Sequence, residues 1–279
     1  MNFLEALLAR MVLATPSLAP FYARLLDRAV PRLRRTALQN LRMAGFRDAE
    51  RIAGDVFESV ARLIQTFARF PELTPQTIHH LIAYEGLENF TRAMDRGKGV
   101  LVATGHLGNW ELSAFAHAWM TAPMNIIVRP LDNPRIDALI ERRRALSGNR
   151  IISKREAARE ILKALRAGQA VGILVDQNSS PSEGVFVDFF GVKACAGTAF
   201  VKFAHHTGAA VVPGFALWEK SQARYVLRFY PEIEMTGNVQ YDTQRVHSVL
   251  ENVIREYPGQ WLWIHRRWKT RPPGEPPLY

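Results

Sequence analysis

The strongest chemical signal in the sequence is the heptapeptide GHLGNWE at residues 105–111. It follows a continuous apolar run and opens a stretch with helical spacing, which places a histidine at the mouth of a buried strand. An imidazole there can act as a general base near neutral pH. A carboxylate on the next helical turn can fix its tautomer, and the helix N-terminus can stabilise an oxyanion. We therefore expect His106 to be the base and Glu111 the carboxylate that supports it.

The same heptapeptide also has a purely structural interpretation. Asn109 is a suitable N-cap residue, and Glu111 in the first helical turn interacts favourably with the helix dipole without any catalytic role. His106 would then be a loop histidine with satisfied hydrogen bonds. The position directly after a buried strand favours the catalytic interpretation.

The flanking sequence alternates between strand-like and helical patterns. Such alternation predicts an α/β domain with a mainly parallel central sheet flanked by helices. We expect an N-terminal helical, membrane-associating segment over residues 1–70 and the α/β domain over 71–279. The helical patterns cover 49–69, 86–96, 109–120, 133–146, 155–166, 197–206 and 242–256, and the strand-like runs cover 99–104, 125–129, 171–175, 209–217 and 224–233.

Two further polar residues come directly after strand-like runs. Arg129 follows one run and Asp176 follows another, and a long loop continues from Asp176 to Gly184. Ligands of open parallel sheets bind beyond the carboxyl ends of the strands. We therefore expect Arg129 and Asp176 to face a substrate, although Asp176 could equally cap its own loop.

Composition limits the class of protein and the kind of partner. With 48% hydrophobic and 22% charged residues, the chain should fold into a globular core. The net charge of +10 indicates an anionic partner, which could be a membrane, a nucleic acid or an acidic protein. Cys195 is the one cysteine, so no disulfide can form within the chain. The sequence lacks nucleotide-binding glycine fingerprints and paired metal-binding motifs, and we expect no cofactor and no metal.

Both ends of the chain carry apolar or basic segments with two interpretations each. The first 22 residues are apolar and aromatic but are interrupted by charges and prolines, and arginines follow them. This pattern is typical of a segment that lies in a membrane interface. It equally fits an ordinary helix packed on the domain. Near the C-terminus, Trp261 and Trp263 alternate as packing residues do. The basic run between His265 and Arg271 would bind lipid phosphates or form a solvated tail.

Seven segments together resemble the bacterial lipid A late acyltransferases, the lauroyl and myristoyl transferases of lipid A assembly. That family is related to the glycerolipid acyltransferases through a His-x4-Asp/Glu motif. The matching segments keep the order and spacing of the family and cover most of residues 85–272. They are GHLGNWE (105–111), VRPLDNPRID (128–137), Arg144 with Gly148, VDQN (175–178), EGVFVDFFG (183–191), TGAAVVP (207–213) and WLWIHRRWKTRP (261–272).

The resemblance implies a glycerolipid-acyltransferase-like fold and direct acyl transfer. Acyl carrier protein would donate the acyl chain, and a hydroxyl of a lipid A precursor would accept it, with His106 as base and Glu111 as its support. The enzyme would work on the cytoplasmic face of the bacterial inner membrane, attached to its surface. Arg144 resembles a family arginine that supports catalysis or binds phosphate, although it also belongs to a run of arginines typical of a solvated helix face. The substrate contacts would be made by Gly108, Asn109, Arg129, Arg144 and Asp176.

Three other functions stay open at this stage. The acceptor could be another glycolipid, an ornithine-type lipid or a lysophospholipid. A histidine base that admits water would hydrolyse thioesters instead of transferring the acyl group. The basic charge would also suit a non-enzymatic protein that binds membranes or nucleic acid.

Overall fold

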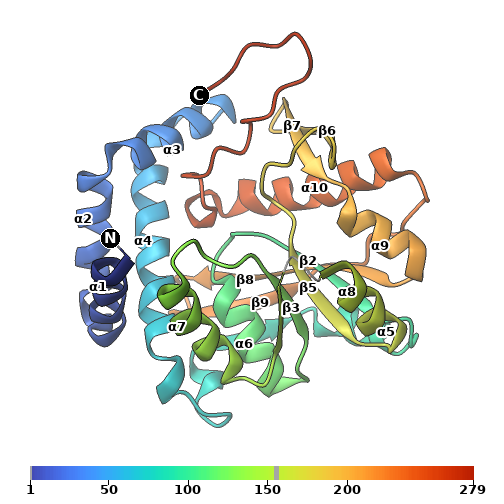
Figure 1. Ribbon diagram of the computed structural model, residues 1–279, viewed down its shortest axis with the longest axis horizontal. Helices are drawn as coiled ribbons and strands as arrows, with labels where there is room; N and C mark the ends of the chain where they lie inside the picture. Colours follow the sequence, from blue (N-terminus) through green and yellow to red (C-terminus); the bar gives the residue numbers. More distant parts are fainter. Residues whose placement is uncertain (1, 154–156) are drawn as a thin grey trace.

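The computed structural model describes residues 2–153 and 157–279, and its centre is a seven-stranded sheet (Figure 1). The strand order is β1-β9-β8-β2-β5-β3-β4. The strands are β1 (Ile82–Glu85), β2 (Val100–Thr104), β3 (Asn125–Val128), β4 (Arg150–Ser153), β5 (Ala170–Leu174), β8 (Ala210–Glu219) and β9 (Arg224–Phe229).

Most neighbouring strands run parallel. β2 lies between β5 and β8 and is parallel to both, and β3 is parallel to β4 and β5. The exception is the antiparallel pair of β8 and β9, which the chain joins by a short turn, so that β9 and its parallel partner β1 run against the rest. The expected mainly parallel α/β fold is therefore confirmed.

The alternating side chains of β2 pack on helices on both sides of the sheet. Val100 and Val102 face a cluster formed with α5 and α6, whereas Leu101 and Ala103 face a cluster formed with α8 and α9. This double coverage explains why the strand is a continuous apolar run. The helices of the two faces are α5 (Leu87–Met94), α6 (Trp110–Met120), α8 (Ala157–Arg166), α9 (Ala199–Thr207) and α10 (Val239–Glu256), and α7 (Pro134–Ala145) follows β3.

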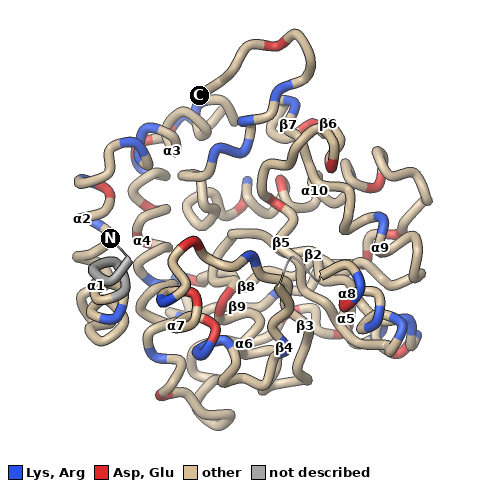
Figure 2. Tube along the Cα trace, in the orientation of Figure 1, with Lys and Arg blue, Asp and Glu red and all other residues tan. Residues whose placement is uncertain are grey.

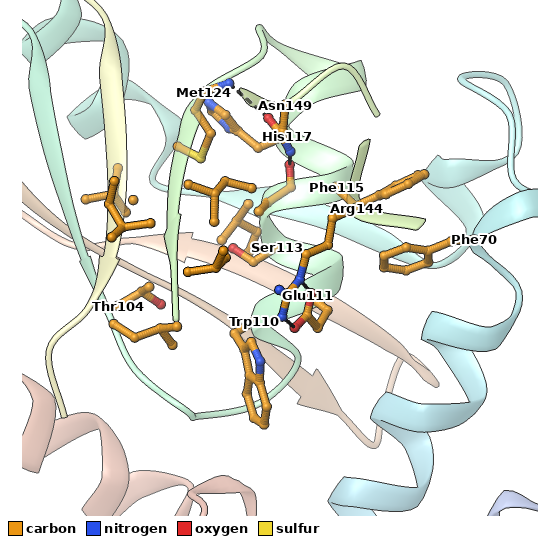
Figure 3. Close-up of a pocket in the computed structure, with 18 of the residues that line it drawn as sticks. Phe70, Thr104, Trp110, Glu111, Ser113, Phe115, His117, Met124, Arg144 and Asn149 are labelled. Carbon is orange, nitrogen blue, oxygen red and sulfur yellow. Dashed lines mark hydrogen bonds and ion pairs between the residues drawn. The ribbon is translucent and has the colours of Figure 1, made fainter. Parts of the chain in front are cut away.

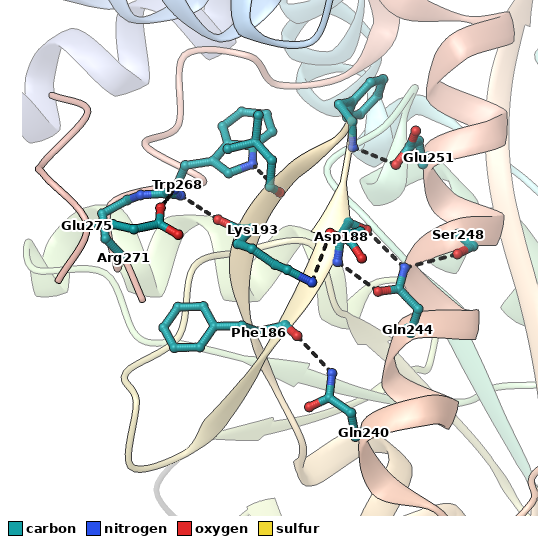
Figure 4. A network of polar contacts seen from close by, with 12 residues as sticks. Phe186, Asp188, Lys193, Gln240, Gln244, Ser248, Glu251, Trp268, Arg271 and Glu275 are labelled. Atoms are coloured by element: carbon teal, nitrogen blue, oxygen red, sulfur yellow. Dashed lines mark hydrogen bonds and ion pairs between the residues drawn. The ribbon is translucent and has the colours of Figure 1, made fainter. Parts of the chain in front are cut away.

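A second, two-stranded sheet packs against α10. Its strands β6 (Gly184–Phe189) and β7 (Val192–Gly197) are antiparallel. Figure 4 shows how α10 holds this hairpin: the Gln244 side chain accepts from the backbone N–H of Asp188 at 2.7 Å and donates to its carbonyl at 2.9 Å, while Gln240 donates to the carbonyl of Phe186 at 2.8 Å. The hairpin fixes the far end of the loop that begins at Asp176.

Four helices form the N-terminal part of the chain: α1 (Asn2–Ala14), α2 (Ala19–Ala29), α3 (Pro31–Met43) and α4 (Ala49–Ala68). The first three lie at one side of the molecule, and α4 connects them to the sheet (Figure 1). One face of α4 belongs to the same apolar cluster as Trp261, Trp263 and Trp268 of the C-terminal segment. Among the described helices, none is long and apolar enough to cross a membrane.

Several elements differ from the sequence-based expectation. β1 and β4 were not expected, and each has four residues at an edge of the sheet. The stretch after Gly184 forms a hairpin, and β9 ends at Phe229 instead of residue 233. Residues 155–156 of the predicted helix 155–166 lie outside the described residues.

Candidate active site

His106 lies on the loop between β2 and α6, beside the residue that follows β5. Thr104 and Leu174 are register partners on the parallel strands β2 and β5, so the residues two positions further on also lie side by side. The Nδ1 atom of His106 is 2.9 Å from Oδ1 of Asp176, and the backbone N–H of His106 donates to Oδ2 at 2.9 Å. Trp261 donates its indole N–H to the same Oδ2 at 2.9 Å. Asp176 therefore fixes both the ring and the backbone of His106.

The charges of this pair determine the tautomer of the imidazole. Burial alone would raise the pKa of Asp176, but the charge and hydrogen bonds of His106, with the bond from Trp261, hold this pKa well below its usual range. Burial is the largest single influence on His106 and lowers its pKa, but the charge and hydrogen bond of Asp176, together with the charge of Glu111, raise that pKa above its ordinary value. Because Asp176 is ionised, the neutral ring carries its proton on Nδ1. Its Nε2 atom is then the one that can accept a proton.

Glu111 does not make the expected hydrogen bond to His106, because its carboxylate is held by a guanidinium. Arg144 of α7 donates to both carboxylate oxygens, from Nε at 2.8 Å and from Nη2 at 2.6 Å. The Glu111 side chain is only 12% exposed and the Arg144 side chain 22%. Glu111 acts on His106 through its charge, which raises the pKa of the imidazole, while the charge of Arg144 opposes it. Asp176, and not Glu111, therefore holds the His106 ring in place, while support of His106 by Glu111 in catalysis stays a prediction.

Gly108 and Asn109 are buried and shape the loop that carries His106. Gly108 has a φ of +65°, and a Cβ atom there would lie 2.0 Å from the carbonyl oxygen of Ala216, so only glycine fits. The Asn109 side chain caps α6 by accepting from the N–H of Leu112 at 3.0 Å. Both residues were expected to bind substrate, and this stays a prediction; the structure gives each of them a role in shaping the loop.

Arg129 is not part of this group. Its side chain is 79% exposed on the loop after β3, and its ion pair with Asp132 spans 3.9 Å. It lies at the expected carboxyl edge of the sheet but has no contact there that would fix its position relative to His106.

An apolar pocket opens beside the loop between β2 and α6 (Figure 3). It lies between α6 and strands β2, β3 and β5 and has a volume of about 740 Å³ including its open mouth. Trp110 and Glu111 lie toward one end of the view and Met124 and Asn149 toward the other. The apolar lining includes Phe70, Val102, Phe115, Met124, Ile126, Ile127, Val128, Leu174, Leu227 and Phe229.

The polar groups of this pocket carry little net charge. Burial lowers the pKa of His117 to about 4, so this imidazole is neutral at physiological pH, and its Nδ1 lies 2.8 Å from the Tyr84 hydroxyl. Glu111 and Arg144 neutralise each other. Trp110 connects the pocket to the base, because its ring contacts the His106 ring edge to face with centroids 4.9 Å apart. A hydrocarbon chain could therefore lie in the pocket with its polar end near His106.

The C-terminal segment contributes more to the site than its sequence indicated. Trp261 and Trp263 are buried, as their alternation predicted, and Trp261 also holds Asp176. Arg267 lies in the basic run expected to bind phosphates or to be solvated, but it is fully buried and donates to the carbonyl of Cys195 at 2.6 Å. Across the described ranges, no cluster of His, Cys, Asp or Glu residues could hold a metal ion.

The fold and the site together define a class of protein. A histidine base, oriented by a buried aspartate at the carboxyl edge of a parallel sheet and next to an apolar pocket, is typical of an enzyme that activates a hydroxyl group near a hydrocarbon-bearing substrate.

Comparison with known families identifies the group within that class. The model of the bacterial lipid A biosynthesis acyltransferases matches residues 6–270, so the chain belongs to this family, which confirms the resemblance found in its motifs.

Individual relatives agree with this membership. The chain is 32% identical over 199 residues to the lipid A biosynthesis palmitoleoyltransferase of Escherichia coli (strain K12), an alignment that covers 70% of this chain and 64% of the relative. It is 30% identical over 197 residues to the lauroyltransferase of the same organism, again with 70% and 64% covered. Its identity to the myristoyltransferase is 24% over 248 residues, or 87% of this chain and 77% of the relative. The chain thus spans slightly less than two thirds of the length of the first two relatives.

Proposed function

We propose that this protein transfers a fatty acyl chain from acyl carrier protein to a hydroxyl of a lipid A precursor, with His106 as general base. The observation that carries the proposal is the His106–Asp176 hydrogen bond of 2.9 Å next to the apolar pocket, in a member of the lipid A acyltransferase family. The names of the relatives support, by analogy, a fatty acyl group as the group transferred and lipid A as the acceptor class.

The proposed reaction uses the Nε2 atom of His106. This atom takes the proton of the acceptor hydroxyl while its oxygen attacks the carbonyl carbon of the acyl thioester. The tetrahedral intermediate then collapses, the carbon–sulfur bond breaks, and the leaving thiolate receives the proton from the imidazolium. Asp176 stabilises the imidazolium, as the acid does in hydrolase triads. Glu111 supports the imidazolium through its charge and holds Arg144 in place.

The pocket supports the acyl chain of the donor in this proposal. Its lining is mainly apolar, and its charged residues, Glu111 and Arg144, lie toward the end where Trp110 contacts His106. Arg144 would then act on the thioester end of the substrate as well as on Glu111. Arg129, exposed at the same edge of the sheet, would contact a phosphate of the acceptor.

The acidic donor and the anionic acceptor both suit the charge of the chain. The net charge is +10, and Lys and Arg are distributed over many elements, including α2, α3 and α7 (Figure 2). Opposite charge on acyl carrier protein would increase its rate of association.

We also propose that the N-terminal helices and α7 form one membrane-facing surface. Large apolar side chains are exposed on α1 and α2, and Leu131 and Leu146 are exposed at the two ends of α7, which packs against α1. Phe21 is 59% exposed, and Leu7 and Leu25 are each 53% exposed. Arg24, Arg28, Arg32 and Arg35 are exposed around them. Apolar side chains would enter the lipid interface, and each arginine would add about 1 kcal/mol on anionic lipid.

The decisive experiment is an acyl transfer assay with purified protein. Acyl carrier protein thioesters of several lengths are offered with a tetra-acylated lipid A precursor or with a lysophospholipid. We expect transfer to the lipid A precursor and its loss in His106→Ala. Transfer should be normal in the matched variant His80→Ala, because His80 is exposed and lies outside the motif at residues 105–111.

Each alternative outcome identifies a different error. An active His106→Ala protein would remove His106 as the base. Transfer to the lysophospholipid alone would replace the acceptor, and release of free fatty acid alone would indicate a thioesterase. Salt-dependent binding of duplex DNA without any acyl transfer would favour a non-enzymatic basic protein.

A further inference from the structure

Three backbone N–H groups of the loop between β2 and α6 are engaged inside the protein. The N–H of His106 donates to Asp176, that of Gly108 to the carbonyl of Gln260 at 2.9 Å, and that of Asn109 to the carbonyl of Ala216 at 2.8 Å. These three groups are therefore not available to an oxyanion. A side-chain donor beside His106 can take that role, because negative charge develops on the carbonyl oxygen during attack.

One side chain already lies at the reactive nitrogen of His106. The amide Nε2 of Gln177 is 3.4 Å from the Nε2 of His106, at the long end of the hydrogen-bond range. Since the Nδ1 of the ring is bound to Asp176, its Nε2 carries the lone pair, and the amide is oriented as a donor to it. An acceptor hydroxyl must come within hydrogen-bond distance of the same nitrogen, so it must displace the Gln177 amide.

The neighbours of Gln177 are fixed, whereas its own side chain is exposed. Asp176 before it is buried and accepts three hydrogen bonds. Asn178 after it exchanges two hydrogen bonds with Thr270, at 2.9 and 3.0 Å, and its N–H donates to the His265 ring at 3.2 Å. The backbone at 177 is thus held in place, and only rotation of the side chain is needed to move the amide by a short distance.

We propose that Gln177 is a substrate-contacting catalytic residue whose amide donates a hydrogen bond to the oxyanion of the tetrahedral intermediate. In the structure the amide lies where the acceptor hydroxyl must bind. When the hydroxyl binds at the imidazole, the amide turns to the thioester carbonyl oxygen beside it. The inference rests on the proposed acyl transfer and adds no covalent step, because the proton still moves from the hydroxyl to His106 and then to the leaving thiolate.

The test compares three substitutions in the full chain. Gln177→Met keeps the length of the side chain and removes the N–H donor, and Gln177→Glu replaces the donor by an acceptor. Gln222→Met is the matched control, because Gln222 lies in the exposed turn between β8 and β9. We expect kcat of Gln177→Met to fall by about 10²-fold, with KM for the thioester nearly unchanged, as for other single oxyanion-hole donors. Gln177→Glu should lose at least as much, and Gln222→Met should match the wild type.

A second measurement follows the contact without any substrate. The pKa of His106 is determined by NMR titration of the free protein. A donor on Nε2 stabilises the neutral ring, so Gln177→Met should raise this pKa, and Gln177→Glu should raise it further because of its charge. A purely structural role of Gln177 would leave the pKa unchanged.

The outcomes separate this inference from the proposed function. Turnover of Gln177→Met within about threefold of wild type, or faster than wild type, would overturn the oxyanion contact while leaving the acyltransferase assignment intact. A wild-type protein without acyl transfer would refute the proposed function and this inference with it. Loss of activity together with the raised pKa would support the inference.

Discussion

Replacement of Asp176 by Asn gives the most direct test of how His106 is oriented. Two N–H donors, from the His106 backbone and from Trp261, converge on the same oxygen of Asp176, Oδ2. In Asp176→Asn, the amide oxygen must take that position to accept both. The amide NH₂ then faces the Nδ1 of His106, where Oδ1 lies in the wild type. Because NH₂ is a donor, the ring is forced to carry its proton on Nε2.

The expected loss follows from this exchange of tautomers. A ring protonated on Nε2 cannot accept the hydroxyl proton, and the neutral amide no longer stabilises the imidazolium. The equivalent change in hydrolase triads lowers kcat by about 10⁴-fold. We therefore expect a loss of 10³- to 10⁴-fold, which corresponds to about 4–5.5 kcal/mol of transition-state stabilisation. The hydrogen bonds on Oδ2 remain, so the melting temperature should change little.

Acyl transfer kinetics and ¹⁵N NMR of the His106 ring check the two parts of the prediction. The NMR spectrum should show the proton on Nδ1 in the wild type and on Nε2 in the variant. Asp242→Asn is the matched control, since Asp242 is also buried and lies 2.7 Å from a histidine, His205, but outside the site. It should lower the melting temperature and leave turnover per folded molecule unchanged. An Asp176→Asn protein within tenfold of wild-type kcat would refute the reasoning.

Three further changes test the surroundings of the base. Glu111→Gln removes a negative charge that raises the pKa of His106. The acid limb of the pH–rate profile, expected above pH 6.5 in the wild type, should therefore move to lower pH, and kcat should fall by about 10- to 10²-fold. An acid limb that does not move would contradict this. Met124→Ala should enlarge the pocket and shift the preference toward longer acyl chains, measured by competition between thioesters. It should also destabilise the fold by about 2–4 kcal/mol. An unchanged preference would indicate that the acyl chain binds outside this pocket. The double variant Phe21→Ser/Leu25→Ser should bind anionic vesicles at least about tenfold more weakly in a flotation assay. Tyr241→Ser, which changes an exposed aromatic residue on α10, should bind like the wild type. Flotation of the double variant equal to that of the wild type would argue against the membrane-facing surface.

The central elements of the fold were predictable because their side chains are buried on both sides. β2 and β5 read as continuous apolar runs, and the helices between them read as periodic patterns. β1 and β4 were missed because each has only four residues at an edge of the sheet, where packing demands little of the sequence. The β6–β7 hairpin was taken for a loop because it packs on α10 and not on the main sheet.

The site was predictable in its location but not in its pairing. The position of His106 and Asp176 after strands places both at the carboxyl edge of the sheet, and register then brings them together across 70 residues of sequence. Spacing along the sequence favours Glu111 as the carboxylate that supports His106, because it lies five residues after it. The sequence contains no information on strand order that would have favoured Asp176 over it.

Solvent exposure was the other property that the sequence could not supply. Arg267 belongs to a run of basic residues, and counting charges predicts a solvated or lipid-binding surface. The structure instead places its guanidinium in the core. The Cζ atom of Arg267 lies 5.4 Å from the Phe189 ring centroid, and its Nη1 donates to the carbonyl of Cys195. Burial lowers the pKa of Arg267 to about 10, which leaves it charged at neutral pH. A charge count over a segment therefore says nothing about which of its members reach solvent.

The two carboxylates of the site have separate tasks, and this follows from how their charges are balanced. Asp176 accepts its hydrogen bonds from His106 and Trp261, so in the proposed mechanism its negative charge would stabilise the His106 imidazolium. Glu111 forms an ion pair with Arg144, and the two charges act on the pKa of His106 in opposite directions. Removal of Glu111 would leave His106 beside an unpaired guanidinium. Without Glu111, the charge of Arg144 would oppose protonation of His106 at the moment when the base must accept a proton. In the proposed mechanism, Asp176 would therefore stabilise the imidazolium that forms, and Glu111 would neutralise the arginine that faces the pocket.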